Sequence, residues 1–128
     1  MKKLQFFILL LFCTVAITAQ QPKPTHTGTW WKDKSGLYKE AFVSGYKLGA
    51  HHAIGHDTDL TPFGVTELVA GVDTFYKDFR NRNIVFSDAI GFVSDQLRGI
   101  PDDKLNAELL KMRAAAAGNS TAGMDDAP

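Results

Sequence analysis

Apolar residues recur every three or four positions along most of this 128-residue chain, and this period constrains its fold more than any other feature. The clearest case is residues 67–80, which follow Thr66 as a helix cap. The predicted inward side chains of this segment are Leu68, Val69, Val72, Phe75, Tyr76 and Phe79. Extended sequence is limited to a short piece at 84–86, too little to build a sheet. The pattern predicts an all-α protein.

Three further helices are predicted at residues 36–54, 89–98 and 104–117. The predicted amino-terminal caps are Ser35 for the first, Ser87 or Asp88 for the second, and Asp102 or Asp103 for the third, which Pro101 precedes. Gly55 is predicted to end the first helix and Gly99 the second. The predicted buried faces of the last two helices are Ala89, Ile90, Val93 and Leu97, and Leu105, Leu109, Met112 and Ala116. Together these segments make a small four-helix domain.

Within the predicted helix at 36–54, Gly45 and Gly49 should each cost about 1 kcal/mol relative to alanine. With two alanines they form a row of small side chains at every fourth position: Ala41, Gly45, Gly49 and Ala53. Such a row lets a second helix approach closely, which we expect to offset the cost. The alternative is that Gly49 breaks the segment into two shorter helices. The predicted inward stripe is Leu37, Tyr38, Ala41, Phe42, Tyr46, Leu48, Gly49 and Ala53.

The amino terminus has the pattern of a secretory signal peptide. Lys2 and Lys3 precede an apolar run over residues 4–17, and small residues lead to a predicted cleavage after Ala19. The run is shorter than the roughly 20 residues of a membrane-spanning helix. The only cysteine, Cys13, lies inside it, so the mature chain is expected to have no disulfide. Cleavage leaves 12 basic and 14 acidic residues, a net charge of −2, with no basic face for nucleic acid.

These features divide the chain into four parts. We predict a signal peptide at 1–19, a flexible leader at 20–29, a helical domain at 30–117 and a disordered tail at 118–128. The expected location of the mature protein is the periplasm or the exterior, with no membrane attachment after cleavage. A domain of this size buries enough surface for one core.

Several short motifs resemble the Rap/Tai group of immunity proteins of type VI secretion. They are Trp31 and Ser35, FVSGY at 42–46 with Gly49, GVT at 64–66 with Leu68 and Val69, Phe75-Tyr76, Arg80-Asn81, and Ile84 to Asp88, Ala89 and Val93. The resemblance spans roughly residues 30–97 and implies an exported, all-helical protein, usually a dimer, that blocks the active site of a peptidoglycan amidase effector. The family's common cysteine pair and the Pro-Cys ending of its last helix are absent from this chain.

Two groups of side chains are candidates for contact with a protein partner. Adjacent Trp30 and Trp31 cannot both face one core, so one is expected to pack under the helix at 36–54 while the other caps the core or anchors a partner. Arg80 and Arg82 either bind carboxylates of a partner or serve the protein itself, at a helix end or by pairing with Asp88. His56 and Phe63, in the loop after the helix at 36–54, complete the predicted contact surface.

The stretch AHHAIGHDTD at 50–59 has the composition of a metal site. A helix continuing past Gly55 would place His52 and His56 on one face, with Asp57 and Asp59 as further ligands. If Gly55 ends the helix, His51 and His52 lie in its last turn and the other residues belong to a loop. We favour the helix end, and we expect no metal and no cofactor.

No nucleophile, base and acid occur in a pattern typical of an active site, so we expect a protein that binds and does not catalyse. The sequence therefore predicts an exported protein-binding domain, and the family resemblance makes it an inhibitor of an amidase effector. The alternatives are a metal-binding periplasmic protein that uses the His and Asp cluster, and a non-catalytic envelope scaffold.

Overall fold

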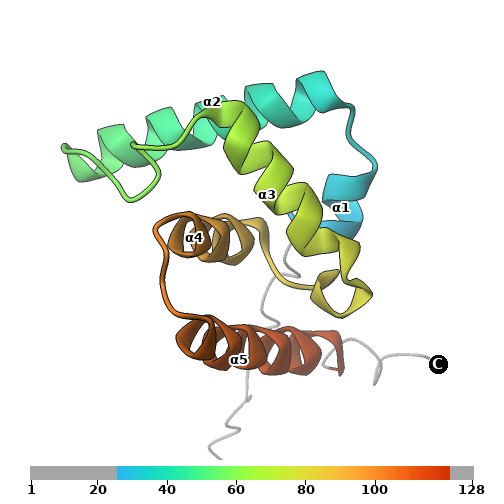
Figure 1. Cartoon of the computed structure of the whole chain (residues 1–128). Helices are drawn as coiled ribbons and strands as arrows, with labels where there is room; N and C mark the ends of the chain where they lie inside the picture. Colours follow the sequence, from blue (N-terminus) through green and yellow to red (C-terminus); the bar gives the residue numbers. More distant parts are fainter. Residues whose placement is uncertain (1–25, 122–128) are drawn as a thin grey trace, which may run out of the picture.

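The computed structural model describes residues 26–121, and side chains up to residue 118. The described chain is helical and contains no named strand, which confirms the all-α prediction. The elements are α1 (Gly28–Lys32), α2 (Gly36–Ile54), α3 (Val65–Lys77), η1 (Phe79–Asn81), α4 (Phe86–Leu97) and α5 (Asp102–Thr121). Helix α4 lies between the pair α2 and α3 on one side and α5 on the other (Figure 1). The predicted signal peptide lies outside the described residues.

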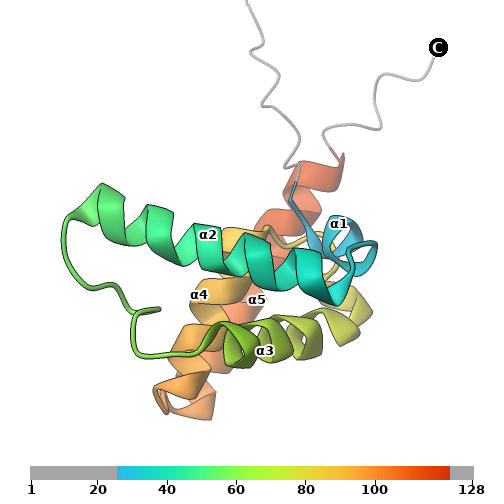
Figure 2. The same cartoon turned by 90° about the horizontal axis from the view of Figure 1, so that it is seen from above.

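Helix α2 begins and ends where the sequence predicts. The Ser35 side chain accepts a hydrogen bond from the Tyr38 amide, and Gly55 ends the helix with a left-handed φ of 76°. The helix crosses the molecule with one side facing outward (Figure 2). Of its 19 residues only Val43 is buried. Phe42 and Tyr46 pack against the core from the predicted stripe, whereas Leu37 and Leu48 are exposed.

The predicted close packing against the small-residue row is wrong. Ala41, Gly45, Gly49 and Ala53 are all exposed, and no atom lies within 4 Å of a Cβ built on either glycine. Helix α2 rests on the core through the larger side chains of Phe42, Val43 and Tyr46, and not through this row. Close approach occurs instead at Gly71 of α3, where an added Cβ would overlap Val93 of α4.

Helices α3 and α4 supply most of the core. Each buries five residues; in α3 these are the predicted Leu68, Val69, Val72, Phe75 and Tyr76. Phe79 is 71% exposed, so its predicted burial is wrong. In α4 the buried residues include Ala89, Ile90 and Val93, but Leu97 is 37% exposed because α4 ends there. This helix begins three residues earlier than predicted and uses neither Ser87 nor Asp88 as its cap; Val85 takes that place without a side-chain bond.

The segment before Trp30 belongs to the domain from at least His26 onward, which corrects the predicted leader at 20–29. Thr27 forms an antiparallel bridge with Val85, and the Phe86 amide donates to the His26 carbonyl at 2.7 Å. Gly28 starts α1 and packs so closely on Tyr76 that a Cβ has no room. The extended piece at 84–86 is therefore paired with the chain before α1.

Helix α5 extends beyond its predicted end at 117 and reaches Thr121, so the first four residues of the predicted tail are helical. The rest of that tail lies outside the described residues. Leu105 and Ala116 are buried and Leu109 and Met112 pack against the core, as predicted. Within residues 26–121, none of the helices combines the length and apolar character required to cross a bilayer.

Candidate functional site

A cleft of about 420 Å³ opens between the carboxyl end of α2, the following loop, α4 and α5. Its apolar lining residues include Tyr46, Ile54, Leu60 and Ile90. Four carboxylates line it as well: Asp57, Asp59, Asp95 and Glu108. A concave surface that combines apolar area with a few polar groups is the usual form of a binding site.

The shape of the loop follows from its turn-forming residues. Gly55 turns the chain away from the axis of α2, and the Thr58 amide donates to the Thr61 hydroxyl at 2.8 Å. Leu60 is only 7% exposed and anchors the loop on the core. This anchor holds the neighbouring Asp57 and Asp59 beside the cleft.

One cation bridges two of the four acids. Arg98 at the end of α4 lies 3.1 Å from Asp59 and also forms an ion pair with Asp95. The hydrogen bond to Asp95 and the charge of Asp59 raise the pKa of the Arg98 guanidinium above its ordinary value. Asp57 lies 3.7 Å from His51, and no lysine or arginine among residues 26–118 pairs with Glu108 or Asp57. The cleft therefore retains a net negative charge that attracts cations.

Tyr46 of α2 is one of the residues that line the cleft. Burial raises the pKa of this phenol above its ordinary value of 10.0, and the charge of Asp88 raises it further. The phenol is therefore protonated at neutral pH and available as a hydrogen-bond donor. Carboxylates, a neutral phenol and apolar carbons together suit the aliphatic stem and charged tip of a lysine or arginine side chain.

The histidines do not gather as a metal site. Because α2 ends at Gly55, His52 and His56 do not share a helical face, and the His56 ring lies 2.8 Å from the Asp57 carbonyl. In the part of the chain that the structure describes, no group of three His, Cys, Asp or Glu side chains is placed to hold a metal ion. The helix-end interpretation describes this segment correctly, and His56 lines the cleft.

The two tryptophans occupy different environments. Trp31 is 1% exposed, and its indole donates to Asp73 at 2.7 Å, so it cannot serve as the predicted partner contact. Trp30 is partly exposed and packs on His26 and Phe42, with ring centroids 4.5 and 4.9 Å away. The Lys34 ammonium lies 5.3 Å from the Trp30 ring. Trp30 thus caps the edge of the core, which was one of the two expected roles.

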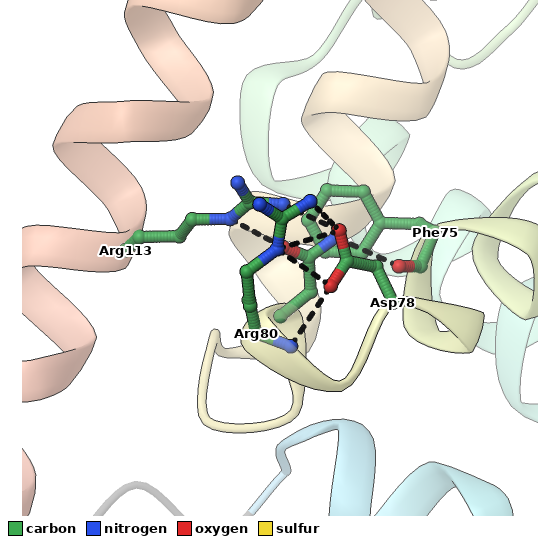
Figure 3. Close-up of polar contacts among 5 residues, drawn as sticks. Phe75, Asp78, Arg80 and Arg113 are labelled. Atoms are coloured by element: carbon green, nitrogen blue, oxygen red, sulfur yellow. Dashed lines mark hydrogen bonds and ion pairs between the residues drawn. The ribbon is translucent and has the colours of Figure 1, made fainter.

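Arg80 pairs with Asp78 within the turn after α3, and not with Asp88. The Arg80 guanidinium donates two hydrogen bonds to Asp78 Oδ2, at 2.6 and 3.1 Å. Arg113 of α5 donates to the same oxygen at 2.9 Å (Figure 3). These bonds hold the pKa of Asp78 well below its ordinary value, chiefly through Arg80. Arg82 is exposed, and within residues 26–118 its side chain forms no ion pair.

The predicted contact residues fall into two groups. His56 and Phe63 lie in the loop that follows α2, whereas Trp30 lies in α1, before α2, and Arg80 and Arg82 lie in the turn after α3. A helix of 19 residues is about 28 Å long, so the two groups form no single small site. Phe63 is half-buried against the core, and its carbonyl accepts from Lys47.

Sequence reasoning did not identify Asp95 and Glu108 as neighbours of Asp57 and Asp59. These acids come from three separate segments, and nothing in their spacing indicates a common cleft. None of the protein-family models, curated proteins or solved structures compared with this chain matches it. The site is therefore interpreted from its own geometry.

Proposed function

We propose that this protein is exported and acts without catalysis, by binding a basic segment of another protein in the cleft between α2, α4 and α5. The observation that carries the proposal is that apolar side chains and four carboxylates line one cleft of about 420 Å³. A lysine or arginine side chain fills such a space with its stem on the apolar side chains and its charge at the acids.

The sharper form of the proposal rests on the resemblance to Rap/Tai immunity proteins. In that form the partner is a secreted peptidoglycan amidase, and the bound protein blocks access to its active site. A basic loop beside the amidase active site would then occupy the cleft. This form of the proposal expects a gene for a small amidase beside the gene for this protein.

The first experiment measures binding of the mature protein to that amidase by calorimetry, together with the remaining amidase activity. We expect a complex that inhibits the enzyme. Glu108→Gln and Asp57→Asn should each weaken binding about tenfold, because each removes a charge that no lysine or arginine among residues 26–118 neutralises. Glu40→Gln is the matched control, since it removes an exposed charge of α2 outside the cleft.

Salt provides a second readout for the same complex. Raising the ionic strength should weaken the wild-type complex more than the Glu108→Gln complex, because screening acts on the charges across the interface. Equal binding by all variants would contradict the role of the cleft. An oligomer with no other partner would favour the scaffold alternative instead.

A further inference from the structure

A second surface lies at the carboxyl end of α3, a helix about 20 Å long whose amino end follows the loop of the cleft. We call it the basic turn and define it as Lys77, Phe79, Arg80, Arg82 and Leu110. Phe79 is 71% exposed and Leu110 is 65% exposed. The three cations are also exposed. The basic turn therefore combines exposed apolar side chains with positive charge, whereas the cleft carries negative charge.

The outward direction of Phe79 is built into the backbone. If α3 continued, Phe79 would fall on the apolar face of the helix and be buried. Instead, Asp78 leaves the helix with an extended backbone conformation, φ −72° and ψ 114°. The Asp78 carboxylate then caps the next turn by accepting from the Arg80 amide at 3.0 Å. One residue thus ends the helix and turns the phenylalanine toward solvent.

Side-chain bonds fix this turn on the domain. The buried Asn81 amide donates to the Phe75 carbonyl at 2.8 Å and accepts from Arg113 of α5 at 2.8 Å. Arg113 also binds Asp78, so the turn is tied to both α3 and α5 (Figure 3). Because the backbone on both sides of Phe79 is held, little conformational entropy is lost when its ring enters a pocket.

The charges around Phe79 indicate the chemistry of its partner. Lys77, Arg80, Arg82 and Arg113 carry four positive charges against the single negative charge of Asp78. Leu110 is exposed one helical turn before Arg113 on α5, on the same side of that helix. Three exposed cations are few for nucleic acid, and a three-residue turn offers no amphipathic helix for a lipid surface.

We propose that the basic turn is a second docking surface, which binds an acidic protein segment and inserts Phe79 into an apolar pocket of that partner. An exposed aromatic ring on a fixed backbone, with cations at its rim, is the usual form of an energetic anchor in an interface. This surface goes beyond the proposed function, because it binds the opposite charge at a separate place.

The test uses the ¹⁵N-labelled mature protein and a synthetic peptide of paired glutamates and leucines, followed by NMR. We expect shifts concentrated at residues 77–82 and 110–113. Arg82→Glu and Phe79→Ser should each weaken binding about tenfold with unchanged melting temperature, since both side chains are exposed. Lys104→Glu, an exposed charge at the start of α5, and the cleft variant Glu108→Gln should bind as the wild type does.

Four outcomes would overturn the proposal. The first is an absence of shifts at millimolar peptide, and the second is equal binding of a peptide with glutamines in place of the glutamates. The third is tighter binding of the same residues to phosphatidylglycerol vesicles or to short single-stranded DNA than to the acidic peptide. Loss of binding in Glu108→Gln alone would place the peptide at the cleft and would also overturn it.

Discussion

At the scale of single residues, short polar side chains and glycines decide how the helices end and meet. Asp78 ends α3, caps η1 and binds two arginines. Asn81 is 3% exposed and satisfies its buried amide through Phe75 and Arg113. The spacing of apolar residues contains no information about these two polar side chains. A prediction from that spacing therefore continues the helix at 67–80 through Arg80 and buries Phe79.

Two glycines within helices are expected to respond to alanine with opposite sign. Gly45→Ala should stabilise the protein by about 0.5–1 kcal/mol, because the new methyl meets open space and the helix gains propensity. Gly71→Ala should destabilise it by about 1–3 kcal/mol, because the methyl overlaps buried Val93. Urea unfolding measures both. A destabilising Gly45→Ala would indicate that the small-residue row is covered by a second molecule in solution.

The ion pairs of Asp78 are expected to make part of the stability depend on pH. Arg80 lowers the pKa of this carboxyl below its ordinary value of 3.8. The pairing therefore stabilises the folded state above about pH 4 and is lost as the pH falls through the lower folded-state value. Asp78→Asn should be less stable than the wild type at pH 7, and the difference should shrink as the pH is lowered from about 4. Glu40→Gln, which removes an exposed charge outside this turn, is the control in the same series of unfolding curves. A difference that stays constant down to low pH would contradict the role of the charge.

At the scale of elements, the helices differ in what holds them. Helices α3 and α4 are amphipathic and bury five residues each, whereas α2 buries one. Polar links complement its packing: Lys39 binds Asp73 at 2.7 Å, and Lys47 donates to the Phe63 carbonyl. Helix α5 is held by four apolar residues and by Arg113, whose bonds reach the turn after α3.

Arg113 is expected to contribute more to the stability of the fold than an ordinary surface cation does. Arg113→Lys should cost about 1–2 kcal/mol, because a lysine cannot reach both Asp78 and Asn81 and leaves a buried amide oxygen without its donor. Hydrogen exchange should also become faster in α5 near residue 113. Lys111→Gln is the control, since Lys111 is exposed on the same helix and should change stability by less than about 0.5 kcal/mol. Equal effects of the two substitutions would show that the link contributes nothing.

At the scale of the whole molecule, charge is separated although the sequence has a formal net charge of zero at pH 7. Four acids line the cleft between α2, α4 and α5, and three exposed cations lie within three residues of Phe79 in the turn after α3. Two surfaces of opposite charge suit two different partner segments. Net charge alone carries no information about this separation, because it sums over both ends.

Export is a property of the whole chain and has a direct test. If the first 19 residues are a signal peptide, the protein recovered from the cell envelope should begin at Gln20. Its intact mass and amino-terminal sequence check this. Replacing residues in the apolar run at 4–17 with charged ones should leave the full-length chain in the cytoplasm. An unprocessed chain in the envelope would contradict cleavage after Ala19.

The sequence by itself determined the elements that depend on local forces. The helical period, the Ser35 cap and the stops at Gly55 and Gly99 act within a few residues, so the sequence alone predicts them. Tertiary structure decided which side of α2 is covered, which tryptophan is buried, and that acids from three segments share one cleft. These outcomes depend on contacts between residues far apart in the chain, and their sequence spacing contains no signal for such contacts.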